Sequence, residues 1–248
     1  MCLYPRLFGP TEETAGAARP FIIHPQVVVE PREDRATARL RVTLSVFPPL
    51  LPALGYLGRA FEQAVAEGPD RYRGLIGNVR LEEETVVLDL SARAAPLWAG
   101  PVAVTFETPL RLRLKGDLVV PERLTPAMLV HAALRRARAL GLPLPQELAV
   151  AARTQAMRLA FDRAHLRWCE TRRYSSRQDM LMAFGGVVGR AELDLTSAAA
   201  VASILEVAAI THLGKGACMG FGRIALHPAS VAAAATAPPH PTVLRQDP

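Results

Sequence analysis

Strand-like and helix-like patterns alternate in both halves of this 248-residue chain, and this alternation restricts its fold more than any other feature. Runs of β-branched and apolar residues mark extended segments, and apolar residues three or four apart mark helices. In the first half, extended segments are expected at 21–29, 38–47 and 79–90, with a helix at 53–67. In the second half, extended segments are expected at 102–106, 110–114, 180–188 and 223–227, with helices at 126–140, 146–169 and 197–210. Two successive β-α-β-β-α-β-like units predict the α+β class, with tandem ferredoxin-like (RRM-like) domains.

Breaks in these patterns suggest the domain boundaries. Gly100–Pro101 separates an N-terminal ferredoxin-like domain, 1–101, from a C-terminal one, 102–228. The second domain is expected to hold an arginine-rich helical insertion at about 125–170 and a glycine-rich loop at 212–223. The Ala/Pro-rich tail, 229–248, has no core-forming pattern and is predicted to be disordered. The most apolar segment, 198–210, is too short to span a membrane and contains Glu206, so it predicts a buried helix.

The charge of the chain favours a polyanionic partner. The net charge is +6, and the segment from Arg111 to Asp179 carries 14 Arg or Lys against 6 Asp or Glu, a local charge of +8. The three cysteines, at 2, 169 and 218, have no disulfide-framework or metal-ligand spacing. Together with an N-terminus that lacks a secretory pattern, they predict a cytoplasmic protein with no metal, no cofactor and no membrane contact.

Basic residues concentrate on the two expected helices of the second half. His131, Arg135 and Arg138 share one helical face, as residues at i, i+4 and i+7 do. Arg153, Arg163 and Arg167 lie within about a quarter of the circumference of the next helix. These faces are either simply solvated, or they bind RNA, because arginine pairs with phosphates and stacks on bases. Three further arginines follow directly and favour the RNA interpretation: Arg172, Arg173 and Arg177.

The segment His212–Arg223, the glycine loop, is the most informative motif. Its glycines, Gly214, Gly216, Gly220 and Gly222, permit close backbone approach to a ligand, and Lys215 and Arg223 add positive charge. The spacing suits a phosphate cradle, although a ligand-free turn remains the alternative. It is not a Walker A loop, because the lysine stands in the wrong place, and not a dinucleotide fingerprint, because the loop follows a helix.

The glycine loop and three earlier segments resemble, in order, those of the CRISPR-associated endoribonucleases that cleave the repeats of precursor RNA, members of the RAMP superfamily. The loop is similar to the family's His-x-Gly-Lys-Gly-x-x-x-Gly-x-Gly loop. The other segments are Thr108–Gly116, similar to the strand that opens the family's second domain; Trp168–Gln178, similar to its Trp…Arg-x-Ser…Arg-Gln segment; and Gly185–Gly189, similar to its Gly-Gly-x-x-Gly strand. The resemblance covers roughly residues 102–227, and in size the chain resembles the small type IV variants.

This resemblance implies a metal-independent endoribonuclease that cuts CRISPR precursor RNA within its repeats by attack of a ribose 2′-hydroxyl. The products would carry a 2′,3′-cyclic phosphate and a 5′-hydroxyl, and slow, single-turnover cutting would suffice for a protein that keeps its product. The implied partners are the precursor RNA, the repeat hairpin of the mature crRNA and other subunits of a CRISPR effector complex in a prokaryotic cytoplasm.

The candidate catalytic residues come from both halves. His24 is the only histidine before residue 131, and a histidine near neutral pKa suits proton transfer. Tyr56 and Arg59 offer a phenol and a cation, and Lys215 is expected to hold phosphate. His212 matches the family loop and is expected to fix its shape. Two alternatives stay open: a non-cleaving RNA-binding subunit of an effector complex, and a basic metabolic enzyme that uses the glycine loop for a nucleotide.

Overall fold

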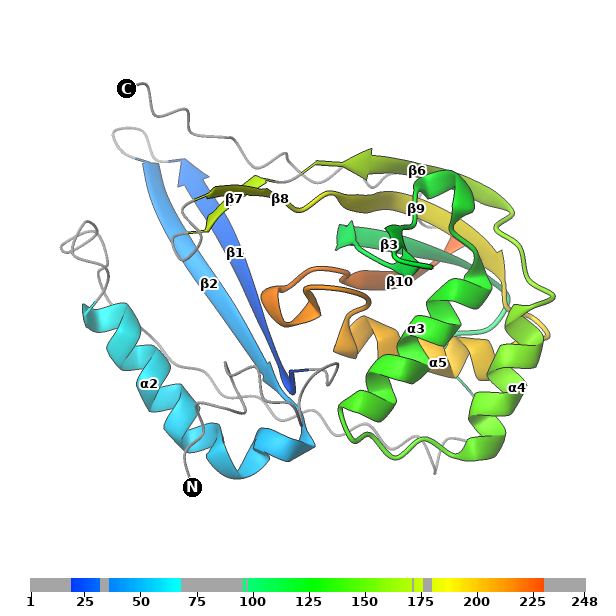
Figure 1. Cartoon of the computed structure of the whole chain (residues 1–248), viewed down its shortest axis with the longest axis horizontal. Helices are drawn as coiled ribbons and strands as arrows, with labels where there is room; N and C mark the ends of the chain where they lie inside the picture. Colours follow the sequence, from blue (N-terminus) through cyan, green and yellow to red (C-terminus); the bar gives the residue numbers. More distant parts are fainter. Residues whose placement is uncertain are drawn as a thin grey trace. The chain divides into compact units, whose positions relative to one another are not determined.

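The computed structural model describes residues 19–31, 36–67, 96, 98–170, 172–175 and 180–229. The chain divides into two compact units. Unit 1 comprises Met1–Arg93 and Arg138–Leu144, and unit 2 comprises Ala94–Ala137 and Pro145–Pro248. The described parts combine helices with antiparallel sheets (Figure 1), which confirms the predicted mixed class.

Unit 1 contains a long hairpin followed by a helix. Strands β1 (Phe21–Pro31) and β2 (Ala36–Val46) pair antiparallel, and a 3₁₀ turn (Pro48–Ala53) leads into helix α2 (Leu54–Glu67). These elements confirm the two strands and the helix expected there. A small core joins Ile22, Phe47 and Leu140, with Leu142 packed against it. The segment expected to be extended at 79–90 lies outside the described residues.

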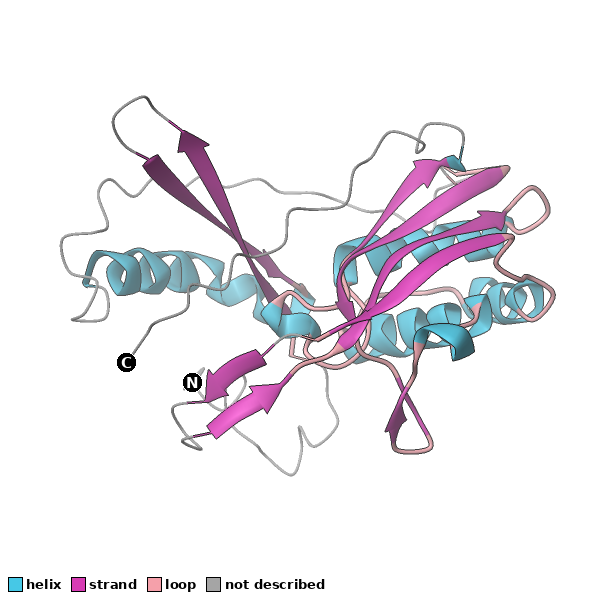
Figure 2. Ribbon diagram, turned by 90° about the horizontal axis from the view of Figure 1, so that it is seen from above, coloured by secondary structure: helices cyan, strands magenta, loops and turns pink. Residues whose placement is uncertain are grey.

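Unit 2 is built on a four-stranded antiparallel sheet in the order β10-β3-β9-β6. Its strands are β3 (Pro101–Leu110), β6 (Arg163–Cys169), β9 (Gly186–Asp194) and β10 (Ile224–Pro228). Helices α3 (Pro126–Ala139), α4 (Gln146–Ala156) and α5 (Ala199–Thr211) lie against one face of this sheet (Figures 1 and 2). We call the other face, which these helices leave uncovered, the open face.

Shorter elements connect the sheet and the helices. Strands β4 (Arg113–Leu114) and β5 (Asp117–Leu118) form a tight hairpin, and a 3₁₀ turn (Pro121–Arg123) precedes α3. Strands β7 (Arg172–Ser175) and β8 (Met180–Ala183) form a second hairpin between β6 and β9. The last 3₁₀ turn, Ala217–Met219, lies inside the glycine loop.

The alternation of the strands explains which side of the sheet is packed. On β3, Val102, Val104 and Phe106 are buried, and they stand opposite Leu193, Ala191 and Gly189 of β9. Because successive side chains of a strand point to opposite faces, these residues fix the helix-covered face. Helix α5 closes the core with Val201, Ile204 and Leu205, all 1% exposed or less, so the apolar segment is a buried helix as predicted.

The predicted helix at 146–169 is wrong in its second half. Helix α4 ends at Ala156, and residues 163–169 form strand β6, which pairs with β9 from Arg163↔Glu192 to Cys169↔Gly186. Arg163 and Arg167 therefore lie on one face of a strand. They do not share a helical face with Arg153, which was the prediction. Among the described helices, none has the length and apolar content needed to cross a bilayer.

Candidate functional site

The glycine loop is fastened along its whole length to the end of strand β3. Leu213 N donates to Gly222 O (2.9 Å) and closes the loop on itself, while Gly222 N donates to Pro109 O (3.1 Å). On the other arm, Lys215 N donates to Arg111 O (2.8 Å) within a parallel bridge between Arg111 and Gly214. The loop is therefore an ordered extension of the sheet, held by segments more than 100 positions apart in sequence.

Thr108 forms the third fastening point. Its hydroxyl donates to Gly220 O (2.8 Å) and accepts a hydrogen bond from Arg223 N (2.9 Å), so one side chain joins both sides of the loop's exit. Next to it, Arg223 Nε lies 2.7 Å from Glu107 Oε2. Arg223, predicted to bind RNA, therefore already has a carboxylate partner.

Two glycines of the loop are required by geometry. Gly214 and Gly222 have φ of +76° and +66°, in the left-handed region that other residues rarely adopt. A Cβ at Gly222 would collide with the Leu213 carbonyl oxygen, and one at Gly214 would lie 2.5 Å from Arg111 O. Glycine at 222 therefore lets the loop close on itself, and glycine at 214 lets it approach Arg111 at the end of β3.

His212 opens the loop in a strained conformation. Its φ of 56° and ψ of 165° lie in a region occupied almost only by glycine, and its side chain is buried, with 6% exposed. This burial leaves little of the ring for contact with a ligand and fits a role in shaping the loop.

Arg111, whose backbone carbonyl binds the loop, has a buried side chain. Arg111 Nε donates to Gly185 O (3.2 Å), and its Cζ lies 4.8 Å from the ring centroid of Phe184. Phe184 in turn stacks on Phe221 of the glycine loop, with centroids 5.6 Å apart and planes 15° from parallel. Burial lowers the pKa of Arg111, as does nearby Arg113, while Glu170 raises it, but an arginine keeps its charge under all ordinary conditions.

Trp168 lies next to Gly185, and these residues belong to two of the four segments that resemble the endoribonuclease family. Its indole Nε1 donates to Glu170 Oε2 (2.9 Å), and both side chains pack over Gly185, where a Cβ would meet them at 2.5–2.6 Å. Gly186 likewise has Leu110 O where its Cβ would be. The strand end at 108–111, the segment at 168–170, the glycines at 185–186 and the glycine loop therefore form one contiguous structure.

A second arginine packs behind the loop. Arg136 of α3 donates from Nε to Thr211 O (3.1 Å) at the end of α5, and burial lowers its pKa while Cys218 of the loop raises it. It is thus a structural cation, placed where α5 turns into the loop.

Lys215 is the loop residue best placed to meet an anion. Its side chain is exposed, while its backbone is fixed to Arg111. An ammonium held at the tip of a rigid loop can pair with a phosphate without a large loss of conformational freedom. The geometry is compatible with the predicted phosphate contact.

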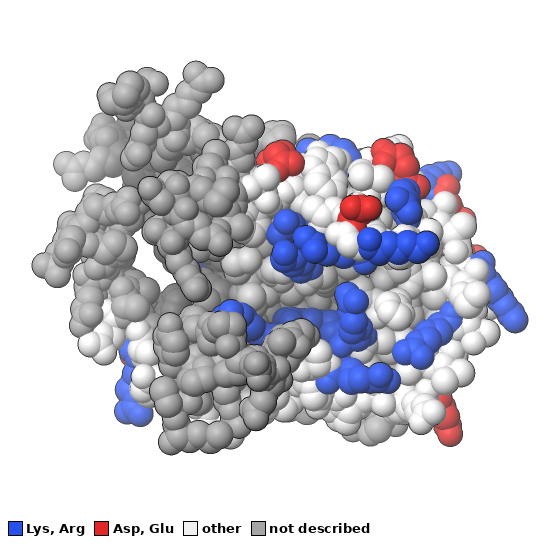
Figure 3. Space-filling model, viewed as in Figure 1, with Lys and Arg blue, Asp and Glu red and all other residues white. Residues whose placement is uncertain are grey.

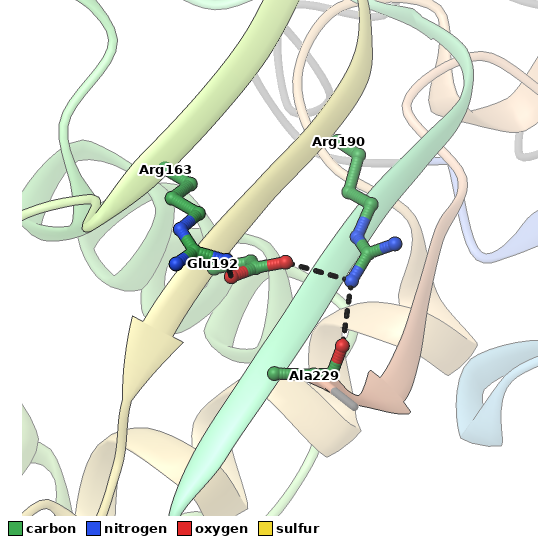
Figure 4. Close-up of polar contacts among 4 residues, drawn as sticks. All are labelled: Arg163, Arg190, Glu192 and Ala229. Atoms are coloured by element: carbon green, nitrogen blue, oxygen red, sulfur yellow. Dashed lines mark hydrogen bonds and ion pairs between the residues drawn. The ribbon is translucent and has the colours of Figure 1, made fainter. Parts of the chain in front are cut away.

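The open face of the sheet carries further cations. The register places Arg163, His165 and Arg167 of β6 beside Glu192, Arg190 and Val188 of β9. Arg190 Nη2 donates to Glu192 Oε1 (2.8 Å) and to Ala229 O (2.9 Å), so it is held in place (Figure 4). Arg163 Nη1 lies 4.0 Å from Glu192 Oε2, and its side chain is 77% exposed, so its guanidinium stays accessible.

The remaining predicted cations belong to unit 2, except Arg138, which belongs to unit 1. Arg135 and Arg138 are exposed on α3, and Arg153 is exposed on α4. Arg172 and Arg173 lie in β7, whereas Arg177 falls outside the described residues. Over the described surface in Figure 3, Lys and Arg side chains outnumber Asp and Glu, in line with the local charge computed from the sequence.

The other predicted catalytic residues belong to unit 1. His24 lies in β1 opposite Thr43 and is partly buried, while Tyr56 and Arg59 are exposed three residues apart on α2. Lys215 belongs to unit 2. Among the described residues, no group of three or more His, Cys, Asp and Glu is arranged to hold a metal ion.

Sequence reasoning missed the residues that build the loop's support. Thr108 and Arg111 stood in a segment singled out for its resemblance, but nothing in their spacing showed that they fasten a loop 100 residues away. The stack of Phe184 on Phe221 and the half-buried Arg136 had no sequence signal at all, because they depend on tertiary packing.

Comparison with known proteins assigns this arrangement to a family. Residues 104–224 match the family model of the CRISPR-associated endoribonuclease Cas6. A product complex of a Thermus thermophilus Cas6 has a similar structure, with a TM-score of 0.55 and 20% identity, covering 91% of this chain and 89% of that chain. A product complex of a second Cas6 is similar with a TM-score of 0.50 and 20% identity, covering 91% and 90%. No curated protein matches significantly. At these identities the structures show the fold, while the family model spans all four converging segments, and residues 104–224 therefore belong to the Cas6 family of CRISPR-associated endoribonucleases.

Proposed function

We propose that this protein cuts CRISPR precursor RNA within the repeats without a metal ion and remains bound to the mature crRNA. The observation that carries the proposal is the convergence of four segments on the glycine loop, inside the region matched by the family model. A loop so extensively fastened to β3 presents Lys215 in a fixed position, which is what binding of one particular phosphate requires.

In the proposed reaction, a ribose 2′-oxygen attacks the adjacent phosphorus in line. The bond from phosphorus to the 5′-oxygen breaks, leaving a 2′,3′-cyclic phosphate, and the departing oxygen takes up a proton to become a 5′-hydroxyl. His24 is proposed to transfer protons, and Lys215 to stabilise the negative charge of the pentacovalent phosphorane. Tyr56 and Arg59 are proposed to assist from α2, as a phenol and a cation.

We further propose that the RNA follows the basic surfaces of unit 2. Supporting this, Arg135, Arg153, Arg163 and Arg167 are exposed, so their guanidinium groups are available to phosphates. The arginines of β7, Arg172 and Arg173, with Arg177, are proposed to extend this contact. Other subunits of a CRISPR effector complex are proposed partners of the protein with its retained crRNA.

The domain arrangement proposed for this function is a pair of ferredoxin-like domains, 1–101 and 102–228, with 229–248 as a tail. The strand order β10-β3-β9-β6, with helices on one face, supports this for the second domain.

The test is cleavage of the repeat RNA from the host's own array, in EDTA. A control RNA carries a single 2′-deoxy substitution at the cut site. We expect cutting in EDTA that the substitution abolishes, with a cyclic phosphate on the upstream product. His24→Ala and Lys215→Ala should each slow a single turnover, and by about 10²-fold or more for a residue that transfers a proton.

Two other outcomes would redirect the assignment. Tight binding of the repeat with no product under any condition would make the protein a non-cleaving RNA-binding subunit. Cutting that requires a divalent metal would overturn the metal-independent mechanism.

A further inference from the structure

A cleft in unit 2 contains no residue of the glycine loop and no residue assigned a catalytic role above, while its lining includes Arg135. It opens between the β4–β5 hairpin and the first turns of α3, and its volume is about 370 Å³. Clefts that bind small molecules or single groups of a larger ligand occupy about 300–1,000 Å³. The cleft is thus large enough for one planar ring system.

The floor of the cleft is apolar and well supported. Leu112, Val119 and Ala132 line it and are each 5% exposed. Val119 N donates to Leu112 O (2.9 Å), which ties the two ends of the hairpin together beneath the cleft. Met128 lies beside this floor, and its thioether is suited to contact with an aromatic ring.

The rim of the cleft is basic. Arg113 from the hairpin and His131 and Arg135 from α3 line it and are exposed, and its lining includes no Asp or Glu. The hairpin turn adds exposed Lys115, whose φ of 51° is followed by Gly116 at 97°, the paired positive values of a type I′ turn. A rigid two-residue turn therefore holds one side of this rim.

We propose that this cleft binds one unpaired nucleotide of the RNA, with the base on the apolar floor and its phosphates on Arg113 and Arg135. The inference rests on the proposed RNA substrate and adds to it a preference for a single-stranded position. An apolar floor suits the flat face of a base, and a rim of cations without carboxylates suits the phosphates on either side. A base within a duplex cannot enter, because both of its faces are stacked.

The test uses the full chain labelled with ¹³C on its methionine methyl groups, of which there are six. The Met128 signal is identified with Met128→Leu. The probes are four-nucleotide single strands of adenosine and of uridine, and a blunt RNA duplex. We expect the single strands to shift the Met128 signal saturably and the duplex to leave it unchanged.

A matched pair of variants separates filling of the cleft from a general effect on α3. Ala127 lines the cleft, whereas Ala139 is exposed at the end of the same helix and does not. Ala127→Trp should weaken binding of the single strands about tenfold, the effect of losing one stacked base, and Ala139→Trp should leave it unchanged.

A second pair tests the rim without changing a packed position. Leu114 lines the cleft and is 38% exposed, and Val120 is 39% exposed outside it. Leu114→Glu places a carboxylate beside the phosphates and should weaken single-strand binding more than Val120→Glu does. This pair decides the question if Ala127→Trp fails to fold.

The proposal is overturned if Met128 does not respond to single strands, if the duplex shifts it equally, or if neither cleft variant weakens binding relative to its control. These results are independent of catalysis. Cleavage of the repeat with an unresponsive Met128 would reject the cleft alone, while a responsive Met128 without cleavage would reject the nuclease alone.

Discussion

Gly222 and Thr108 show how much of the glycine loop depends on single atoms. Gly222 has a left-handed φ, and a Cβ at this position would collide with the Leu213 carbonyl oxygen. Thr108 satisfies one donor and one acceptor of the loop with a single hydroxyl. Neither residue contributes a charge, so both act by fixing the positions of the residues that do.

Gly222→Ala tests the first of these residues. The left-handed conformation costs a residue with a Cβ about 1–2 kcal/mol, and the contact with Leu213 adds to this. We expect the free energy of unfolding in urea to fall by at least about 1 kcal/mol, together with slower RNA cleavage.

Gly55→Ala is the matched control. Gly55 lies in α2, and a Cβ there meets no atom within 4 Å, so alanine should stabilise the helix by about 0.5–1 kcal/mol. If Gly222→Ala were as stable as the wild type, the loop would not have the backbone geometry described above.

At the scale of elements, the important contact is the one between the end of β3 and the glycine loop. Hydrogen bonds join Thr108, Pro109 and Arg111 on one side to four loop residues on the other: Lys215, Gly220, Gly222 and Arg223. Because they are distributed along the strand, loss of one should loosen one end of the loop and leave the other attached.

Thr108→Val tests this contact. Valine keeps the shape of threonine but removes both hydrogen bonds, each worth about 0.5–1.5 kcal/mol. We expect the amide of Arg223 to exchange its hydrogen faster, with the amide of Lys215 nearly unaffected. Thr105→Val, on the open face of the same strand, is the control, and equal exchange at Arg223 in both variants would contradict the assignment.

The sequence predicted most elements of the second half, but it failed where a helix ends without a breaker. Between Ala156 and Arg163 there is no glycine or proline to mark the end of α4. The correct signal was present in β6, where Arg163, His165 and Arg167 alternate with Ala164, Leu166 and Trp168, a period of two. The helical spacing of the arginines competed with it, and only pairing with β9 decides between the two patterns.

For the same reason, the sequence predicted only part of the candidate site. The glycine loop could be found from its own residues, because glycine spacing is a local property. Its attachment to β3, the Phe184–Phe221 stack and the Arg111 support depend on which strands are neighbours, and residue spacing does not carry that information.

For the whole molecule, the decisive quantity is the distribution of charge. The segment from 111 to 179 carries a charge of +8, which exceeds the net charge of +6 of the whole chain. The rest of the chain is therefore slightly acidic in sum. A polyanion such as RNA is then attracted to a particular region, and its affinity should fall as salt rises because condensed counterions are released on binding.

Arg167→Gln tests the contribution of the open face. If Arg167 contacts a phosphate, the slope of log affinity against log salt concentration should become shallower by about one. Arg158→Gln removes the same charge from an exposed residue just beyond α4 and should leave the slope unchanged. Equal slopes in the two variants would show that Arg167 acts only through the overall charge.

The strand order has a consequence for how the protein is made. Strand β10, among the last described segments of the chain, pairs with β3, the first strand of unit 2, and the glycine loop directly precedes it. A nascent chain that has not yet emerged past residue 223 can form the β6–β9 pair, but it lacks loop residues that bond to the end of β3. Lys215 therefore takes its fixed position only after both the first strand of unit 2 and the glycine loop, more than 100 residues later, have been synthesised.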